Sequence, residues 1–326
     1  MSLLVPSREA TSGVPAARRQ GHLWAEIKSH RWHYAFLTPM VVLAALFTFW
    51  PIVATALISF FDWDGYEPLT EFVGLANFTE AVTSAQFWNA FRNTFIFTAF
   101  AVFIQMPLAL SIAVLLNNSV LRGRNVYRVL IFLPVVTTTA VVGVVFAVLL
   151  DPNGGTVNTV LQDTGLVDEP VNFLGEEALA LPTVLVVDMW KNLGITMVYF
   201  LAALQTIPAE LYDAAKVDGA SRWQSFRYVT LPLIRPLALI ILLLTVVMSF
   251  NAFDLVQTMT AGGPNYATDI IPTYIYRYAF NPERIVPRYG LASAAALFFG
   301  IAVIVLTVLL VVPARRARLQ RDAGIR

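Results

Sequence analysis

The chain has 326 residues, 57% of them hydrophobic and only 13% charged, with a mean hydropathy of +0.67. A soluble domain carries close to twice that share of charge, and the apolar residues here gather in runs near the length of a bilayer-spanning helix. These properties predict an integral membrane protein. The net charge of +1 says nothing about a nucleic-acid partner, but no basic stripe with interleaved aromatic residues appears, so we expect none. The lack of cysteine excludes disulfides, thiol catalysis and cysteine metal sites.

Residues 1–33 are polar and basic, and we expect them to form a cytoplasmic tail. Within this tail, residues 23–30 either lie along the membrane surface as a short amphipathic helix or are disordered, and the sequence leaves both possibilities open. We expect no signal peptide, because the polar segment before the first apolar run is too long and no small-residue cleavage site follows that run.

Six apolar runs predict six membrane-spanning helices and therefore an all-α integral membrane fold. Together the spans make up a transmembrane domain over residues 34–313, and residues 314–326 form a C-terminal tail. The predicted spans lie at about 34–60, 91–117, 128–150, 180–206, 237–260 and 289–313.

The distribution of Lys and Arg predicts how the chain is oriented. Most of the 22 basic residues fall in the two tails and in the loops at 118–127 and 208–232, whereas the alternate loops at 61–90 and 151–179 are acidic. Basic residues are retained on the cytoplasmic side of a membrane. Both termini and the 208–232 loop are therefore predicted to be cytoplasmic, in a multi-pass protein of the cytoplasmic (plasma or inner) membrane.

The polar loop at 208–232, between the fourth and fifth spans, carries signals for two short helices. Pro208 suits a first helical turn, and Gly219 suits the end of that helix. Ser221 with Gln224 three residues later resembles a capping box, which starts a second helix at once. Two short helices joined at a glycine predict an element that a partner can grip.

This loop resembles the EAA loop of ABC importer permeases. The resemblance rests on an acidic-Ala-Ala triplet, a glycine after three further residues, an aliphatic residue after nine more, and Leu-Pro after one more. These residues are Asp213, Ala214, Ala215, Gly219, Val229, Leu231 and Pro232. Asp stands for the usual Glu and Val for the usual Ile, which are conservative departures. A plain surface hairpin of helices is the alternative that Ala-Ala-x3-Gly alone would favour. We also expect Leu231-Pro232 to stop the second helix and to fix the loop against the next span.

Three other segments resemble permeases of the maltose type: Phe72 to Phe78, the start of the second span from Phe91, and Gly262-Gly263-Pro264. Each is weak by itself, since such Gly and Pro pairs are ordinary turn formers. Together they extend the resemblance from about Phe36 to Leu310. It implies the type I ABC importer permease fold.

No Gly-x4-Gly-Lys-Ser/Thr phosphate loop and no metal-ligand cluster occur in the sequence, so we expect this chain to bind no cofactor, to hold no metal and to catalyse no reaction. The resemblance implies that ATP and Mg lie on two partner nucleotide-binding subunits, which grip the loop. It also implies a second permease subunit and an extracytoplasmic solute-binding protein. The coupling residues it implies are Leu211, Asp213, Ala214, Ala215, Asp218, Gly219, Leu231 and Pro232.

Two polar groups of residues lie within predicted spans. Asp188 and Lys191 share a face of the fourth span, being three residues apart. Ionisable residues at membrane depth indicate a functional site, although these two could instead pair with each other or lie near the outer surface. Ser249, Asn251 and Asp254 lie in the fifth span, where interhelical hydrogen bonding is the alternative to a role in the solute pathway.

The resemblance implies that a sugar binds near mid-membrane, against the spans that flank the EAA loop. Position by position, the implied residues are Asp188, Lys191, Asn192, Ile195, Ser249, Phe250 and Asn251. Trp190 and Phe250 are candidates to stack on a sugar ring, although packing is the commoner role of such residues. Lys191 and Asn192 differ from the apolar and glycine residues expected for maltose, which favours another polyhydroxylated solute.

We therefore predict a permease subunit of an ATP-driven importer of a di- or oligosaccharide. A glycerol-3-phosphate or glycerophosphodiester importer is the alternative, because Lys191 suits a phosphate. A membrane enzyme acting on a lipid-linked sugar is the rival from another class, with Asp62 and Asp64 as its only loose candidates for paired carboxylates. A secondary transporter is disfavoured because no inverted repeat of broken helices is evident.

Overall fold

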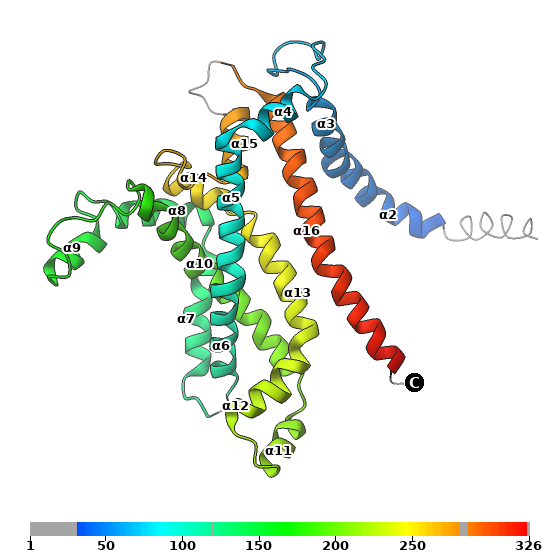
Figure 1. Cartoon of the computed structure of the whole chain (residues 1–326). Coiled ribbons are helices and arrows are strands. Elements are labelled where there is room, and N and C mark those ends of the chain that lie inside the picture. Colours follow the sequence, from blue (N-terminus) through cyan, green and yellow to red (C-terminus); the bar gives the residue numbers. More distant parts are fainter. Residues whose placement is uncertain (1–30, 119, 281–285, 325–326) are drawn as a thin grey trace, which may run out of the picture. The chain divides into compact units, whose positions relative to one another are not determined.

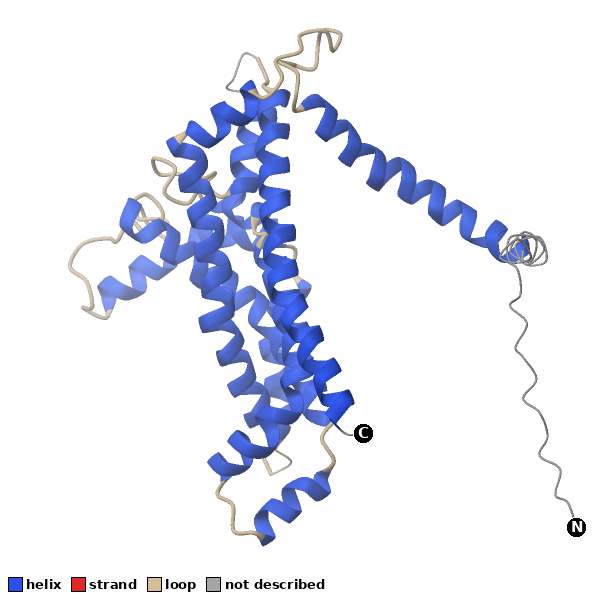
Figure 2. Cartoon of the chain, turned by 45° about the vertical axis from the view of Figure 1, so that its right-hand side comes forward, coloured by secondary structure: helices blue, strands red, loops and turns tan. Residues whose placement is uncertain are grey.

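The computed structural model describes residues 31–118, 120–280 and 286–324. The possible amphipathic helix at 23–30 lies outside the described residues. Within them the protein is helical throughout (Figure 2), and the only β-type pairing is an isolated bridge between Phe61 and Phe72. The predicted all-α fold is confirmed. The chain divides into two compact units, Met1–Thr55 and Ala56–Arg326.

The first unit contributes most of the first predicted span. This span is continuous from Trp32 to Ile58 and consists of α2 (Arg31–Ala44), a π-helical turn η1 (Ala45–Phe49) and α3 (Trp50–Ile58). It matches the predicted span at 34–60 to within two residues at each end.

The second unit contains the remaining helices (Figure 1). In chain order they are α4 (Ala76–Thr83), α5 (Ala85–Phe100), η2 (Ala101–Gln105), α6 (Met106–Asn117), α7 (Arg124–Val136), α8 (Thr139–Leu149), α9 (Thr156–Asp163), α10 (Glu177–Gln205), α11 (Ala209–Val217), α12 (Arg222–Ser225), η3 (Phe226–Thr230), α13 (Leu231–Ser249), α14 (Phe253–Met259), α15 (Ile271–Phe280) and α16 (Tyr289–Gly324). Helix α10 packs against α6, α7 and α13 and so forms the centre of this unit.

Five helices of the described residues are long and apolar enough to cross a membrane, and a bent pair raises the number to six. The bent pair is α7 and α8, whose axes turn by 96°. The prediction of one helix over 128–150 is therefore wrong. Pro134 lies in the last turn of α7, and Thr137 and Thr138 that follow are extended, with ψ of 148° and 141°. Helix α16 continues to Gly324, so the segment predicted as a C-terminal tail at 314–326 is helical over most of its length.

All three π-helical turns precede a proline by the same spacing: Pro51 after η1, Pro107 after η2 and Pro232 after η3. A proline has no N–H to donate and its ring collides with the carbonyl four residues before it. A π turn moves the preceding bond to the fifth carbonyl, as the Leu231 N–H shows by donating to Phe226. The helix thereby continues through the proline, and Leu231-Pro232 does not stop it as predicted.

Close packing of α7 on α10 depends on Gly194. A Cβ atom at this position would lie 2.4 Å from the carbonyl oxygen of Ile131 and 2.8 Å from Cα of Phe132. Backbone atoms cannot move aside as a flexible side chain can. The missing side chain therefore permits the helix–helix contact.

We expect Gly194→Ala to push α7 away from α10 and to destabilise the fold by about 1–3 kcal/mol, as overpacked cores do. The melting temperature of the purified chain in detergent measures this loss. Gly300→Ala is the matched control, since Gly300 is also helical and a Cβ atom added there would meet no other atom within 4 Å. The control is expected to be neutral or slightly stabilising, and equal destabilisation by both substitutions would contradict the argument.

Candidate functional site

The predicted helix pair at 208–232 is confirmed as α11 and α12. Helix α11 is terminated by Gly219, which lies two residues after its last residue, Val217, and has φ of +76°. The Gly219 N–H donates to the Lys216 carbonyl and the Ala220 N–H donates to the Ala215 carbonyl, at 3.0 and 2.9 Å. These two bonds form a Schellman motif. Pro208 is the N-cap residue of α11, one position before the helical turn in which it was predicted.

Helix α12 begins with the predicted capping box. The Gln224 N–H donates to the Ser221 hydroxyl at 3.3 Å, and the Ser221 N–H donates to the Gln224 side chain at 2.7 Å. The hydroxyls of Tyr212 and Thr230 lie 3.0 Å apart and join α11 to η3. The pair is therefore a fixed element at one end of the second unit (Figure 1).

Most of the predicted coupling residues are accessible. Asp213, Ala214, Asp218 and Gly219 are exposed, Leu211 is 42% exposed, and Ala215, Leu231 and Pro232 are intermediate. Asp213 accepts a hydrogen bond from Lys216 at 2.9 Å, and both side chains remain largely in solvent. Leu231 and Pro232 lie inside the continuous helix that leads into α13.

Three large apolar side chains of α11, α12 and η3 are exposed, and sequence reasoning did not include them among the coupling residues. Val217, Trp223 and Tyr228 are 88%, 69% and 73% exposed. Large apolar side chains gathered at one exposed place indicate contact with another protein or a membrane. Their position next to the EAA-like residues was the available signal.

A groove of about 600 Å³ lies between the helix pair and the neighbouring ends of α6 and α10. Its polar lining includes Asn117, Asn118, Gln205, Lys216 and Arg222. The pair is thus partly separated from the bundle that it joins, and its connection to the spans runs through η3 and the Tyr212–Thr230 contact.

A buried polar cluster lies between α10, α13 and η2. It surrounds a cavity of about 10 Å³, roughly the space of one water molecule. Three of the predicted pathway residues, Asp188, Asn192 and Ser249, line it. Asn192 donates to the Asp188 carboxylate at 3.0 Å, and the Ser249 hydroxyl donates to Thr98 at 3.0 Å.

Sequence reasoning missed three polar members of this cluster, Gln105, Thr196 and Thr245. Gln105 donates to the Thr196 hydroxyl at 3.1 Å, and both side chains are buried. Gln105 interrupts an otherwise apolar run in the second span, which was the available signal. Long-range packing of three helices, rather than spacing along one of them, brings these groups together.

The other predicted pathway residues lie apart from the cavity. Trp190 stands with its ring 5.3 Å from that of Phe146, and Phe250 lies between Phe95 and Phe299 at 6.2 and 5.4 Å. Both rings thus take part in packing, and Ile195 is half-buried. Asn251 and Asp254 are exposed, on either side of the turn at Ala252 that separates α13 from α14.

Lys191 is a buried cation on α10, with 7% of its surface exposed. It makes no hydrogen bond or ion pair with the described part of the chain, and its ammonium lies beyond 4.0 Å from the Asp188 carboxylate. The two residues are therefore not a contact ion pair, although the charge of Lys191 acts on the Asp188 carboxylate across this longer distance.

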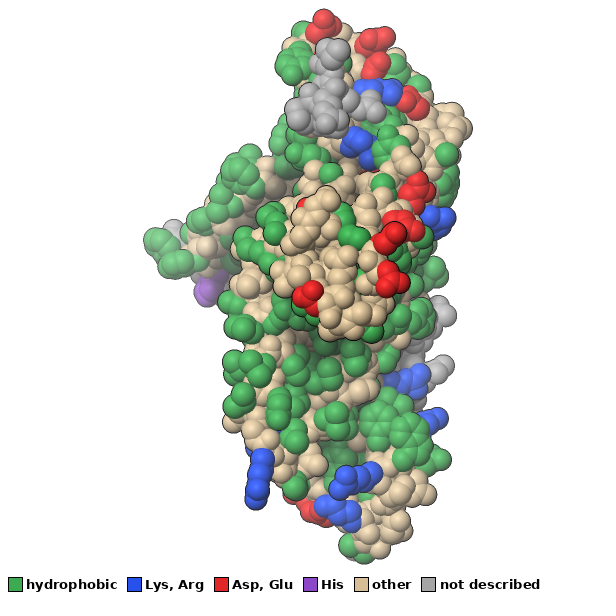
Figure 3. Space-filling view, turned by 90° about the vertical axis from the view of Figure 1, so that its left-hand side faces the viewer, with side chains coloured by type: hydrophobic (Ala, Val, Ile, Leu, Met, Phe, Trp, Pro, Cys, Tyr) green, Lys and Arg blue, Asp and Glu red, His purple; other side chains and the backbone are tan. Residues whose placement is uncertain are grey.

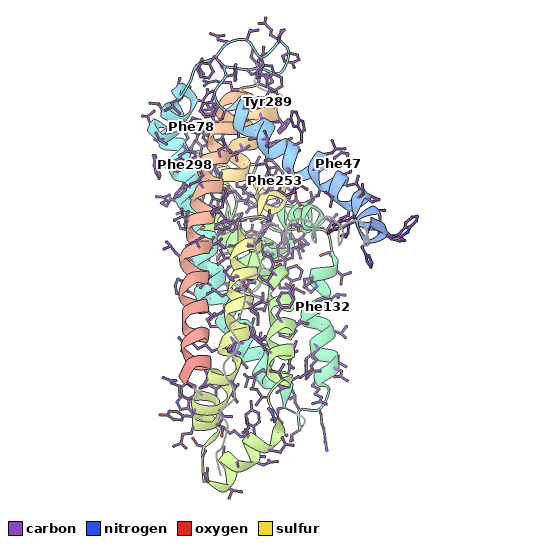
Figure 4. All side chains as sticks on the ribbon, turned by 90° about the vertical axis from the view of Figure 1, so that its right-hand side faces the viewer. Phe47, Phe78, Phe132, Phe253, Tyr289 and Phe298 are labelled. Atoms are coloured by element: carbon purple, nitrogen blue, oxygen red, sulfur yellow. The ribbon has the colours of Figure 1, made fainter. Side chains whose placement is uncertain are left out.

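The segment from Phe72 to Phe78 lies at the end of the second unit opposite α11 and α12, where Figure 4 labels Phe78 and Tyr289. Asn77 donates to the carbonyls of Ser59 and Phe61 at 3.0 and 2.8 Å. Asn93 donates to the carbonyls of Ala267 and Asp269, both at 2.9 Å. These buried amides join α4 and α5 to loops distant in sequence.

Asp62 and Asp64, the carboxylates of the rival enzyme hypothesis, lie at this same end. The Asp64 carboxylate accepts hydrogen bonds from the N–H groups of Tyr66 and Glu67, at 3.0 and 3.3 Å. The bond from Tyr66, followed by that from Glu67, lowers the pKa of Asp64. Asp64 thus stabilises a turn, as an ionised loop residue does.

Charge is separated along the second unit. Figure 3 shows Lys and Arg side chains gathered toward the end that carries α11 and α12, and Asp and Glu side chains gathered toward the other end. Long apolar helices with a buried polar cluster between them, and a helix pair at the basic end, define a membrane transport subunit.

The chain belongs to the family described as "Binding-protein-dependent transport system inner membrane component", which matches residues 105–319. It is 34% identical over 276 residues to a probable ABC transporter permease protein of Brucella suis, covering 85% of this chain and 94% of that protein. It is 30% identical to the lactose transport system permease protein of Rhizobium radiobacter, covering 87% and 94%.

The fold agrees with a solved structure of a bacterial ABC transporter involved in the import of the acidic polysaccharide alginate. The TM-score is 0.79 at 28% sequence identity, and the match covers 90% of this chain and 99% of that one. The predicted permease family and the ABC importer permease fold are therefore confirmed. The chain is a multi-pass inner-membrane component of a binding-protein-dependent transport system.

Proposed function

We propose that this chain is a permease subunit of an ATP-driven importer of a di- or oligosaccharide. The observation that carries the proposal is the polar cluster of Asp188, Asn192 and Ser249, which places hydroxyl-binding groups between the spans that flank α11 and α12. The lactose and alginate transport systems of its relatives support a carbohydrate solute.

In this proposal the end with α11 and α12 faces the cytoplasm, together with both termini. The basic side chains at that end support this orientation, because Lys and Arg are retained on the cytoplasmic side. The acidic end, with α4, α9 and α15, then faces outward.

The chain itself catalyses nothing in this proposal, and two nucleotide-binding partner subunits hold ATP and Mg. The exposed surface of α11 and α12 supports their docking, since Leu211, Val217 and Trp223 offer apolar contact area. Asp213 and Asp218 can meet a basic rim on such a partner. A second permease subunit completes the membrane pathway, and a solute-binding protein delivers the sugar from outside.

Transport follows alternating access. The cavity beside Asp188 holds space for about one water molecule, so a sugar enters only when α10 and α13 separate. Movement of the partner ATPases displaces α11 and α12, and η3 carries the displacement into α13. The Asp188 carboxylate and the Asn192 amide then accept and donate hydrogen bonds to sugar hydroxyls.

The experiment that tests this proposal measures ATP-dependent uptake into vesicles that contain the whole transport complex. Radiolabelled lactose, maltose, trehalose and glycerol-3-phosphate are offered separately with the cognate binding protein. Import of a disaccharide that needs ATP supports the proposal. Uptake of none of the disaccharides, or uptake without ATP, contradicts it.

Asp188→Asn is expected to lower ATP-dependent uptake at least tenfold without unfolding the protein, because it removes the carboxylate but keeps the shape of the side chain. Loss of a charge-assisted hydrogen bond to a solute costs about 1.5–3 kcal/mol. Asp163→Asn is the matched control, as Asp163 is exposed at the end of α9. Equal uptake by the two variants would remove Asp188 from the pathway.

One observation favours glycerol-3-phosphate or another anionic solute as the second candidate. Lys191 is buried and has no ion-pair partner among the described residues, so an anionic group of a solute can supply its counter-charge. Lys191→Met is expected to abolish glycerol-3-phosphate uptake if that is the solute, and to change uptake of a neutral disaccharide by less than about threefold.

A further inference from the structure

We infer that the outer end of the chain holds a second binding site, which takes a single glycosyl unit of the solute. The site is a pocket of about 650 Å³ between α14, α15 and the loop that joins them. Gln257, Asn265, Tyr266, Tyr276 and Arg277 line it, and none of them belongs to the cluster around Asp188. The inference rests on the proposed carbohydrate solute, which it extends.

The loop that forms one wall is held in an unusual backbone conformation. Ala261, Asn265 and Tyr266 have φ of +48°, +46° and +63°. Left-handed conformations of residues other than glycine cost about 1–3 kcal/mol each and collect at functional sites. Three such residues among six indicate that this loop is shaped to contact a ligand rather than only to connect two helices.

Hydrogen bonds from three directions keep this wall in place. Asn89 on α5 donates to the Tyr266 carbonyl at 2.6 Å. Asn265 donates to the Glu177 carboxylate at 2.5 Å. The Thr268 hydroxyl donates to the Gly263 carbonyl at 2.7 Å within the loop. The pocket is therefore formed in advance, which lowers the entropy cost of binding.

Arg277 is the only cationic side chain of the pocket lining. Asp269, which is fully buried, accepts a 2.5 Å hydrogen bond from Nη2 and fixes the guanidinium. The guanidinium also lies 4.4 Å from the centre of the Tyr266 ring. Its Nε is buried and has no hydrogen-bond partner in the described part of the chain.

Two further polar groups of the lining make no hydrogen bond with any described residue: the amide of Gln257 and the hydroxyl of Tyr276. The centre of the Tyr276 ring lies 5.3 Å from that of Phe253 and 5.8 Å from that of Phe280, so its position is fixed. Both side chains are half-buried, so these groups are open to donate to or accept from a ligand in the pocket.

These groups match the chemistry of a sugar. An aromatic ring offers its face to the C–H side of a pyranose, while an amide and a guanidinium donate to adjacent hydroxyls or to a uronic-acid carboxylate. A lipid chain would require a predominantly apolar lining, whereas most of the residues that line this pocket are polar. The site therefore receives the end of the solute at the outer face, before it reaches Asp188 at membrane depth.

The test is direct binding of lactose, maltose and trehalose, each alone, to the purified complex in lipid nanodiscs without the binding protein. Saturation-transfer NMR reports contact of sugar protons with the protein. We expect a signal that Tyr276→Ala and Gln257→Ala lower at least fivefold, and that Tyr276→Phe, which keeps the ring but loses the hydroxyl, lowers less than Tyr276→Ala does. Tyr66→Ala is the matched control, because Tyr66 is 80% exposed at the same end and lies outside the pocket.

Sugar binding that neither Tyr276→Ala nor Gln257→Ala changes, but that Asp188→Asn removes, overturns the inference and leaves the proposed function intact. An absence of binding to the wild type, in a complex that imports a disaccharide, overturns it likewise. If vesicles import no sugar, the proposed function fails, whereas a signal lost in Tyr276→Ala still supports the glycosyl site.

Discussion

The double variant Ala215→Glu, Gly219→Asp is expected to abolish ATP-dependent uptake. The exposed surface of α11 and α12 lies where the partner ATPases are proposed to dock. The space around Gly219 is open for 4 Å, so a side chain there meets nothing within the chain and collides only with a partner. Uptake into vesicles measures the effect, and we expect it to fall at least tenfold. Co-purification of the ATPase subunits shows whether docking itself is lost.

The control for this variant is Val120→Glu, Gly123→Asp in the turn between α6 and α7. Gly123 has the same φ of +76° as Gly219, so the backbone strain of the substitution is matched. Val120 is 82% exposed, and the added charges are the same. Normal uptake by the control and loss by the test variant assign the effect to docking. Normal ATP-dependent uptake by both would show that α11 and α12 are not the coupling element.

Arg277→Met is expected to destabilise the chain by about 3–5 kcal/mol, because it leaves Asp269 buried without a cation. Burial already raises the pKa of Asp269 in the wild type, against the opposing effect of Arg277. Without Arg277 the carboxyl group must protonate in order to remain buried. The melting temperature in detergent at pH 8 reports the loss.

The pH dependence of this variant has a definite sign. The folded-state pKa of Asp269 lies above its unfolded value, so the folded state binds the proton more tightly and the penalty disappears as pH falls. The gap between Arg277→Met and the wild type should therefore narrow from pH 8 to pH 5. Adding Asp269→Asn to Arg277→Met should recover most of the loss. A gap that is independent of pH and of Asp269 would contradict the ion-pair argument.

Local signals predicted the helix pair well. Gly219 and the Ser221–Gln224 capping box act within a few residues of the chain, so the sequence contains all the information that they need. The same local reasoning failed at Leu231-Pro232 and near Pro134. A proline can be absorbed by a π turn or can accompany a sharp bend, and packing of the neighbouring helices decides between these outcomes.

The polar cluster was only half predictable. Asp188 and Ser249 drew attention as polar residues within apolar runs, but nothing in the sequence shows that Gln105 joins them in the same cluster. In the same way, nothing in the sequence shows that a turn at Ala252 separates Asn251 from Asp254 within the predicted fifth span. Convergence of side chains from three helices is a property of tertiary packing, which spacing along one helix does not encode.

The continuity of the helix through Pro232 has a mechanical consequence. From Arg222 to Ser249 the helix has no break, and at 1.5 Å per residue it is a stiff rod about 40 Å long. A tilt of about five degrees imposed at α12 displaces the far end of such a rod by roughly 3–4 Å, which is close to the width of a water molecule. Helix α13 ends at Ser249, which lines the polar cavity. A small tilt of α12 therefore produces the largest displacement of this helix at the wall of the cavity.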